Sequence, residues 1–315
     1  MRILVTGGAG FIGSHIAHRL LESGHEVVVL DNFFTGKKEN LAAIAKDVRL
    51  VEGDVRNIET VEKTAAGCEV IFHEAAIVSV PFSVERPQES HDVNIQGTLN
   101  VLQAARKSGT RRVVFASSAA IYGEEPTLPK SEAMRPEPMS PYGVEKITGE
   151  HYLATWSKLF NVETVALRYF NVFGPRQDPK SPYSGVISIF VDRILAGKPI
   201  SFFGDGSQVR DFVYVANVVD ANILASTRDA AHVSGRAFNV ACGRRTTLLD
   251  LASLIERAAG RTVERSFAEP RAGDIKESLA DISRARAALG YEPKVDVEEG
   301  LRLLVEHVRA ANVSA

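Results

Sequence analysis

The sequence predicts an α/β fold in which a doubly wound parallel sheet is followed by a smaller α/β domain. Short apolar runs alternate with helical patterns through the first half of the chain. These runs are apolar at nearly every position, as in strands that helices cover on both faces. A glycine-rich segment directly follows the first run, at the position of the first strand-to-helix turn of such sheets.

The strands are predicted from runs rich in β-branched residues, and the helices from the longer segments between them. The predicted strands cover residues 3–5, 27–30, 48–51, 70–72, 113–116 and 162–167. The predicted helices cover residues 12–22, 59–66, 87–107 and 141–160. Ser140 suits the N-cap of the last helix and Pro141 suits its first position, so we expect this helix to begin there.

The pattern loosens after about residue 170, where loops rich in proline, glycine and serine separate shorter elements. We expect residues 1–175 to form the first domain and residues 176–315 mainly the second, which shapes a ligand site. Three later elements could return to the first sheet: a strand at 212–215, a helix at 216–227 and a strand at 237–240. The boundary is therefore expected to be discontinuous, with returns near 212–241.

Charge and cysteine content exclude several classes of function. The 37 basic and 39 acidic residues give a net charge of −2, which predicts neither a nucleic-acid nor a membrane surface. Cys68 and Cys242 lie far apart without metal-ligand spacing, so we expect reduced thiols and no metal site. No signal peptide or bilayer-spanning run is evident, and the expected location is the cytoplasm.

The glycine-rich turn carries the pattern of a dinucleotide site. Gly7, Gly10 and Gly13 lie between the first strand and the first helix, where backbone must approach a pyrophosphate. Phe11 and Ile12 complete the start of that helix. The alternative interpretation, a tight turn without a ligand, remains open for the motif taken alone.

Asp31 ends the second strand, where a carboxylate accepts hydrogen bonds from both ribose hydroxyls and repels a 2′-phosphate. The residue therefore favours NAD over NADP, although Lys37 and Lys38 keep NADP open. The later strand ends outline a groove for adenine and ribose, and the full predicted cofactor set adds Asn32, Gly36, Asp54, Val55, Ala75, Ala76 and Asn94. Asn94 is equally well explained as a structural amide within its helix.

Tyr142 and Lys146 lie one helical turn apart and follow the serine pair Ser117 and Ser118. Residues four apart share a helix face, so the Lys146 ammonium is expected beside the Tyr142 phenol. A nearby positive charge favours phenolate, and moving a tyrosine pKa from near 10 to neutrality requires roughly 4 kcal/mol. The combination predicts oxidation and reduction of an alcohol, with a cationic nicotinamide ring adding to the charge of the lysine.

With these residues assembled, the chain resembles the extended short-chain dehydrogenase/reductase family, and within it the UDP-hexose 4-epimerases. The resemblance covers nearly the full length. Its motifs are Thr6 to Gly13, Ser117 to Gly123, Tyr142 to Lys146, Leu167 to Pro175, Arg210 to Phe212 and Arg271 to Asp274. It implies a Rossmann-type NAD-binding domain, tightly bound NAD, and catalysis by Ser118, Tyr142 and Lys146.

The resemblance also implies how the ligands are held. Tyr142 and Lys146 would hold the nicotinamide ribose, and Tyr169 would also contact the cofactor. Arg210 and Arg271 would hold the diphosphate of a UDP-sugar. The implied substrate set is Ser79, Ser118, Asn171, Val186, Phe203, Arg210, Arg271, Asp274 and Ser278. The predicted helices 87–107 and 141–160 resemble those through which relatives form a homodimer by a four-helix bundle.

Ala119 and Ala120 separate this chain from the dehydratases that it resembles. Those enzymes carry Asp-Glu after the residue that matches Ser118, and alanine cannot transfer a proton. The predicted reaction is therefore 4-epimerisation through a 4-keto sugar, with a reductase or dehydrogenase as the alternative. A protein that only senses NAD is disfavoured, because it has no use for Ser118, Tyr142 and Lys146 together.

Ser278 occupies a position where the family carries either a large tyrosine or a small residue. The small side chain predicts room for an N-acetyl group, so UDP-GlcNAc/UDP-GalNAc, UDP-glucose/UDP-galactose or both pairs are expected substrates. Two residues depart from the family pattern. Glu74 stands where relatives carry an uncharged residue, and Val78 where some glucose epimerases carry a lysine.

Overall fold

The computed structural model describes residues 1–178, 185–270 and 276–314. Its core is a seven-stranded sheet of order β11-β6-β5-β4-β1-β2-β3, in which every neighbouring pair is parallel. Its strands are β1 Arg2–Thr6, β2 Glu26–Asp31, β3 Val48–Glu52, β4 Val70–His73, β5 Arg112–Ser118, β6 Glu163–Tyr169 and β11 Arg236–Val240. The predicted Rossmann-type, doubly wound fold is confirmed.

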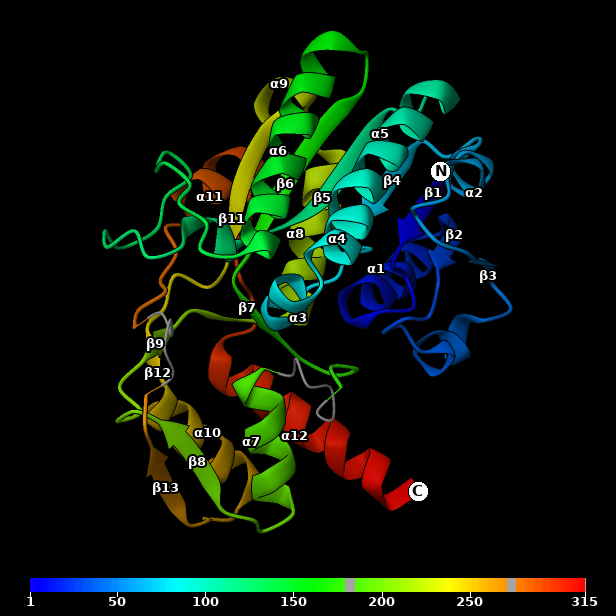
Figure 1. The fold of residues 1–315 in the computed structure, drawn as a ribbon. Coiled ribbons are helices and arrows are strands. Elements are labelled where there is room, and N and C mark those ends of the chain that lie inside the picture. The colour runs from blue at the N-terminus through cyan, green and yellow to red at the C-terminus, as the bar shows by residue number, and fades with distance from the viewer. Residues whose placement is uncertain (179–184, 271–275, 315) are drawn as a thin grey trace.

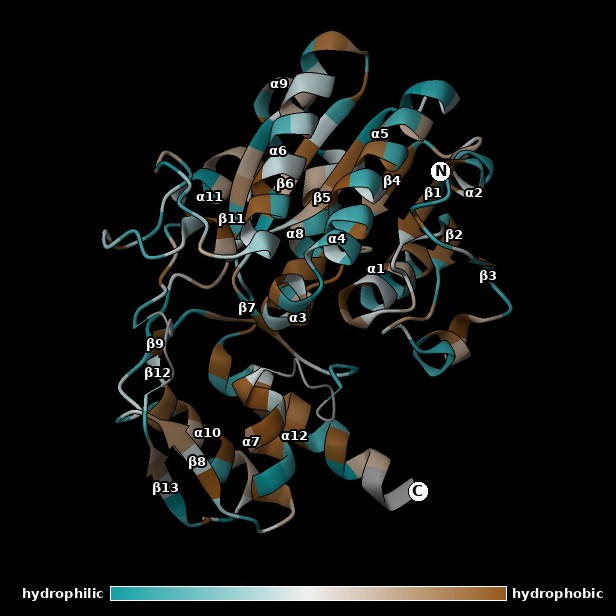
Figure 2. Cartoon of the chain, in the orientation of Figure 1, coloured by the Kyte–Doolittle hydropathy of each residue, from teal (hydrophilic) through white to brown (hydrophobic). Residues whose placement is uncertain are grey.

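The inner strands form because their side chains are buried on both faces of the sheet, whereas the edge strand β3 is largely exposed. In β1, Ile3 and Val5 belong to one hydrophobic cluster, whereas Leu4 belongs to a second cluster on the opposite face. Figure 2 shows these strands as hydrophobic segments between more polar helices. This two-sided burial explains why the runs read as continuously apolar in the sequence.

Helices cover both faces (Figure 1). α1 Phe11–Glu22 and α8 Val215–Thr227 pack on the cluster that contains Ile3. α2 Ile58–Ala65, α5 Gly97–Ser108 and α6 Pro141–Leu159 pack on the cluster that contains Leu4. Short helices α3 Val80–Glu85, α9 Ala230–Val233 and α11 Ser283–Leu289, and 3-10 turns Lys38–Ile44 and Ala119–Tyr122, complete this part of the chain.

The predicted helical stretch over residues 87–107 is confirmed, but it is not a single regular α-helix. The segment consists of α4 Pro87–His91, a π-helical turn Asp92–Gln96 and α5. The chain stays helical across both junctions, but its hydrogen-bond spacing widens in the π-helical turn. Such turns occur mostly inside α-helices and often at functional sites.

Of the predicted returns, β11 pairs with β6 and completes the sheet. The strand expected at 212–215 does not join it, because β10 Phe212–Tyr214 pairs instead with β7 Asn171–Phe173. These two strands form a separate parallel pair. The helix that follows β10, α8, nevertheless packs against the large sheet.

The C-terminal lobe has its own hydrophobic cluster, which is distinct from the two beside the large sheet. Its elements are α7 Val186–Leu195, β8 Ile200–Phe203, β9 Val209–Arg210, β12 Thr246–Thr247, α10 Leu248–Ala259, β13 Arg265–Ala268 and α12 Val297–Ser314. In Figure 1 this lobe lies beneath the sheet, with β8 and β13 side by side. No helix in the described part of the chain is both long and apolar enough to cross a bilayer.

Candidate active site

Ser118, Tyr142 and Lys146 meet at the carboxyl end of the sheet. Ser118 is the last residue of β5, and the other two lie in the first two turns of α6. The helix begins as predicted, because the Ser140 hydroxyl accepts a hydrogen bond from the Gly143 backbone N–H at 3.2 Å and Pro141 occupies the first turn. The start of α6 thereby fixes where the tyrosine and the lysine stand.

Lys146 is held between the sheet and the tyrosine. Its Nζ donates a hydrogen bond to the Ala116 carbonyl at 2.8 Å and lies 5.7 Å from the centroid of the Tyr142 ring. Both side chains are buried. Ser118 acts on the Tyr142 phenol as a hydrogen-bonding neighbour that lowers its pKa. The three predicted catalytic side chains are therefore close enough to act on one substrate oxygen.

The expected lowering of the Tyr142 pKa is not produced by the chain alone. Burial raises the pKa of Tyr142 to about 12, and the negative charges of Glu145 and Glu74 act in the same direction. The hydrogen bond with Ser118 works against this rise. Burial also lowers the pKa of Lys146 to about 8. Activation of the phenol must therefore draw on charge that a ligand brings to the site.

The glycine-rich turn approaches the segment that follows β4 so closely that side chains are excluded. Gly7 has φ +67°, and a Cβ on it would stand 2.7 Å from the Ala75 backbone nitrogen. A Cβ on Gly13 would stand 2.3 Å from the Gly7 carbonyl oxygen. Gly10 caps α1 without a side-chain hydrogen bond, so the first amides of the helix have no side-chain acceptor at the cap. Gly7, Gly10 and Gly13 therefore form a glycine cradle that can accept a pyrophosphate.

Asp31 is oriented by backbone amides. Its carboxylate accepts hydrogen bonds from Ala9 N at 2.9 Å and Phe33 N at 2.8 Å, and a Cβ on Gly36 would stand 2.7 Å from it. Burial raises the pKa of Asp31, while those two bonds lower it. Only glycine at position 36 leaves this carboxylate uncrowded, and a fixed carboxylate here fits the ribose of NAD, so the residues present fit this cofactor.

The two lysines that kept NADP open both have carboxylate partners. Lys37 Nζ lies 2.6 Å from Asp178, and Lys38 Nζ lies 3.3 Å from Glu52. A 2′-phosphate would have to compete with these carboxylates for both lysines. The pairs therefore support the preference for NAD that Asp31 predicts.

Arg56 is a residue that the sequence analysis missed. Its guanidinium donates to the Asp54 carboxylate at 2.7 and 3.0 Å, and the Asn32 amide donates to the same group at 2.8 Å. Partial burial raises the pKa of Asp54, but these hydrogen bonds lower it to about 2. Asp54 is thus a permanent anion held at the edge of the predicted adenine groove, next to the buried Val55.

Asn94 lies in the π-helical turn and is buried. Its amide oxygen accepts from Ile77 N at 2.8 Å, and its nitrogen donates to Ile77 O at 2.9 Å and to Glu145 at 2.6 Å. These bonds tie the loop that follows Ala75 and Ala76 to helix α6. The side chain is satisfied by the protein itself, so the structure places Asn94 as a support of the site.

The predicted substrate residues spread over both lobes. Ser79 caps α3 by accepting from Phe82 N at 3.0 Å, and Ser278 N donates to Val209 O beside Arg210. Asn171 begins β7, Val186 begins α7 and Phe203 ends β8. Arg271 and Asp274 lie outside the described residues.

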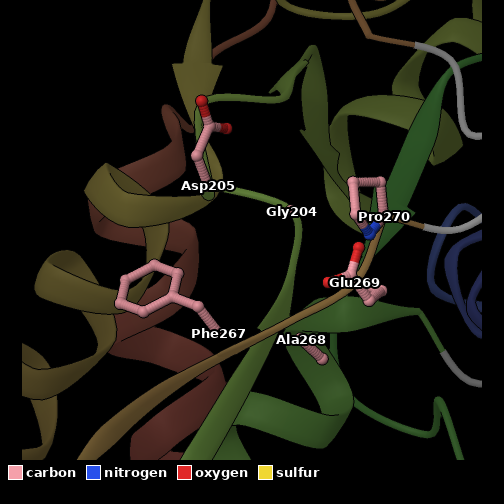
Figure 3. Close-up of a pocket in the computed structure, with 6 residues that line it drawn as sticks. All are labelled: Gly204, Asp205, Phe267, Ala268, Glu269 and Pro270. Atoms are coloured by element: carbon pink, nitrogen blue, oxygen red, sulfur yellow. The ribbon is translucent and has the colours of Figure 1, made fainter.

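A pocket of about 580 Å³ lies in the C-terminal lobe, at the ends of β8 and β13 (Figure 3). It is lined by Gly204, Asp205, Phe267, Ala268, Glu269 and Pro270. The pocket begins directly after Phe203 and ends directly before Arg271 in the sequence, two of the residues in the predicted substrate set. It contains none of the three predicted catalytic residues, which lie in the other lobe.

Comparison with known proteins extends these observations. A family model described as "NAD dependent epimerase/dehydratase family" matches residues 3–241. The structure of UDP-glucose 4-epimerase from Thermotoga maritima with UDP-glucose is 41% identical, with a TM-score of 0.94 over 99% of this chain and 100% of that chain. UDP-N-acetylglucosamine 4-epimerase from Methanobrevibacter ruminantium, in complex with UDP-N-acetylmuramic acid, is 38% identical, with a TM-score of 0.93 over 98% of both chains.

A third structure contains the cofactor. UDP-glucose 4-epimerase from Thermus thermophilus, in complex with NAD, is 41% identical, with a TM-score of 0.89 over 99% of this chain and 100% of that chain. The glycine cradle and the fixed Asp31 carboxylate of the present chain are the features that such a cofactor requires. By the family match and by these full-length similarities, the chain belongs to the NAD-dependent epimerase/dehydratase family.

Proposed function

We propose that this protein is a UDP-hexose 4-epimerase that keeps NAD bound between turnovers. The observation that carries the proposal is the meeting of Ser118, Tyr142 and Lys146 at the carboxyl end of the sheet, beside the glycine cradle. Three solved structures that match nearly the full chain are 4-epimerases of nucleotide sugars, and each contains NAD or a UDP-sugar.

Ser118, Tyr142 and Lys146 each have a separate role in the oxidation of a secondary alcohol. Tyr142 removes the proton of the C4 hydroxyl, and Ser118 hydrogen-bonds the same oxygen. Lys146 supplies positive charge next to the phenol and is placed to hold the nicotinamide ribose. NAD, when bound, supplies the hydride acceptor. Rotation of the 4-keto sugar before reduction inverts C4, with no net redox change.

The residues after Ser118 favour epimerisation over dehydration. Elimination of water needs an additional acid and base, and the 3-10 turn after β5 begins with Ala119 and Ala120. A reductase or dehydrogenase that releases reduced cofactor is the second candidate, because it would use the same three catalytic residues.

Nuclear magnetic resonance of the sugar C4 proton separates these candidates. Purified protein is incubated with UDP-glucose or UDP-GlcNAc while absorbance follows free NADH. The proposal expects the C4 epimer to accumulate to equilibrium without net NADH. Stoichiometric NADH release would identify a dehydrogenase instead.

Ser278 is proposed to set the size of the sugar that can turn over. It follows an isolated bridge to β9 and lies beside Arg210, a proposed diphosphate ligand. Replacing Ser278 by tyrosine should lower kcat/KM for UDP-GlcNAc at least tenfold, about 1.4 kcal/mol, and affect UDP-glucose much less. Ser278→Ala is the matched control and should retain both activities. Equal losses on the two sugars would exclude a size gate.

The finer ligand contacts are proposed on the same basis. Asn171, Arg210 and Arg271 would hold the diphosphate, and Asp274 the uridine ribose, because an arginine fork suits phosphate oxygens. The pocket at the ends of β8 and β13 supports a nucleotide in this lobe. Residues 1–175 with returns near 212–241 would then form the NAD-binding domain, and residues 176–315 mainly the UDP-sugar domain.

A homodimer through α5 and α6 is the proposed assembly. Leu159 and Val144 of α6 are 67% and 47% exposed, so this helix presents apolar surface that a second copy could cover. Sedimentation that showed only monomer would remove this proposal. The two free and buried cysteines support a reducing compartment, and we place the enzyme in the cytoplasm.

A further inference from the structure

A carboxyl group that the proposed reaction does not use lies at the catalytic centre. Glu74 follows β4 directly, at the same edge of the sheet as Ser118. Its backbone N–H donates to the Thr6 carbonyl at 3.1 Å, which continues the pairing of β4 with β1. The backbone therefore fixes where this glutamate stands, beside the glycine cradle.

Two side chains from distant elements hold the Glu74 carboxyl. Tyr169, the last residue of β6, donates its hydroxyl proton to Glu74 Oε1 at 2.9 Å. Asn222 of α8 donates to the Tyr169 oxygen at 2.7 Å, and so leaves the hydroxyl proton of that tyrosine for Glu74. This chain of hydrogen bonds orients the carboxyl without neutralising it, because neither partner carries a charge.

The other carboxyl oxygen is accessible. Glu74 Oε2 accepts no hydrogen bond from residues 1–178, 185–270 or 276–314, and it is not among the buried polar atoms of that part of the chain that lack a partner. A proton can therefore reach and leave Oε2. Burial raises the pKa of Glu74 to about 7, against the lowering effects of the Tyr169 hydrogen bond and the Lys146 charge.

Glu74 stands next to the catalytic pair because β4 pairs directly with β5, the strand whose Ala116 carbonyl holds Lys146. An ionised Glu74 raises the pKa of Lys146 and also raises that of Tyr142. Tyr169 is the other titratable group that it faces, and burial keeps the pKa of that phenol well above its usual value. Glu145 acts in the same sense on Lys146 and Tyr142 from within α6, and its carboxylate is tied to Asn94.

We propose that Glu74 is a proton-linked positioning residue, whose negative charge keeps Lys146 protonated and opposes ionisation of Tyr142. The proposal rests on the proposed function for the roles of Tyr142 and Lys146. It assigns part of the pH dependence of catalysis to a residue that neither binds the sugar nor transfers its proton.

The test is Glu74→Gln, which keeps the shape and an acceptor for Tyr169 but removes the charge. Below about pH 7 the wild-type carboxyl is protonated, so the two proteins should have similar kcat/KM. Above that pH, the fall of kcat/KM on the alkaline side of the pH profile should begin about one pH unit lower in the variant, because Lys146 loses its proton more easily. Glu74→Asp keeps the charge and should retain the wild-type limb. The matched control is Glu69→Gln, which lies exposed just before the other end of β4.

A second readout does not depend on turnover. The ultraviolet absorbance of the Tyr142 phenolate is obtained as the difference between each NAD-loaded protein and its Tyr142→Phe counterpart. Glu74→Gln should move this titration about one pH unit lower. Unchanged limbs and an unchanged titration, or an equal shift in Glu69→Gln, would overturn the role of Glu74. If the protein proved not to be an epimerase, the kinetic measurement could not be made, but the absorbance titration would still test the role of Glu74.

Discussion

Tyr142→Phe is expected to lower kcat by about 10³-fold and to leave UDP-sugar affinity within a few-fold. General base catalysis contributes typically 10²–10⁴ in rate, and phenylalanine removes only the hydroxyl that transfers the proton. The ring is buried and its backbone N–H is bonded to Ser83 Oγ at 3.1 Å, so the packing of α6 should persist. Steady-state kinetics gives kcat, and calorimetry with UDP gives the affinity.

The matched control is Tyr152→Phe, from the same helix. Tyr152 packs edge-on against Trp156 at 6.0 Å between ring centroids, outside the proposed site. It should keep wild-type kcat. If Tyr142→Phe retained most of its turnover, the base would have to be another group, and the assignment of Tyr142 would be wrong.

Gly13→Ala is expected to weaken NAD binding by at least 10²-fold. A Cβ on Gly13 would stand 2.3 Å from the Gly7 carbonyl oxygen and 2.9 Å from the Gly8 Cα. These neighbours are backbone atoms, so relief requires that the turn itself move away from the pyrophosphate position. Calorimetry of the cofactor-free protein with NAD measures the loss, and the melting temperature reports any general destabilisation.

Gly24→Ala is the control at the opposite end of α1. Gly24 has φ +75°, and a Cβ there meets no atom within 4 Å. This substitution should cost about 1 kcal/mol in stability through its left-handed conformation and leave NAD affinity unchanged. Equal NAD affinities for Gly13→Ala and wild type would show that the glycine cradle does not hold the cofactor.

Most of the large sheet was predictable because strands that are buried on both faces are apolar at nearly every position. The sequence indicates less clearly which strands pair with each other and how the hydrogen bonds within a helix are spaced. β10 reads as an ordinary strand, and its sequence does not show that it pairs with β7 rather than with the large sheet. The π-helical turn at Asp92–Gln96 keeps a helical side-chain pattern, so one helix was predicted over three segments.

The motifs likewise placed Tyr142 and Lys146 correctly at the start of α6 but did not reveal that burial raises the pKa of the tyrosine. A spacing of four residues indicates a shared face, whereas the pKa depends on how deeply the phenol is buried. Glu74 was recognisable as unusual, but its partner Tyr169 lies 95 residues away. Only the fold brings the two together.

The most direct test of the account follows the hydrogen on C4. UDP-glucose carrying deuterium at C4 is incubated with the purified protein, and the product is analysed by nuclear magnetic resonance and mass spectrometry. If Tyr142 removes the hydroxyl proton and a bound NAD takes up and returns the C4 hydrogen, UDP-galactose should form with deuterium retained at C4. Product without deuterium at C4, or conversion that never inverts C4, would contradict the proposed epimerase mechanism.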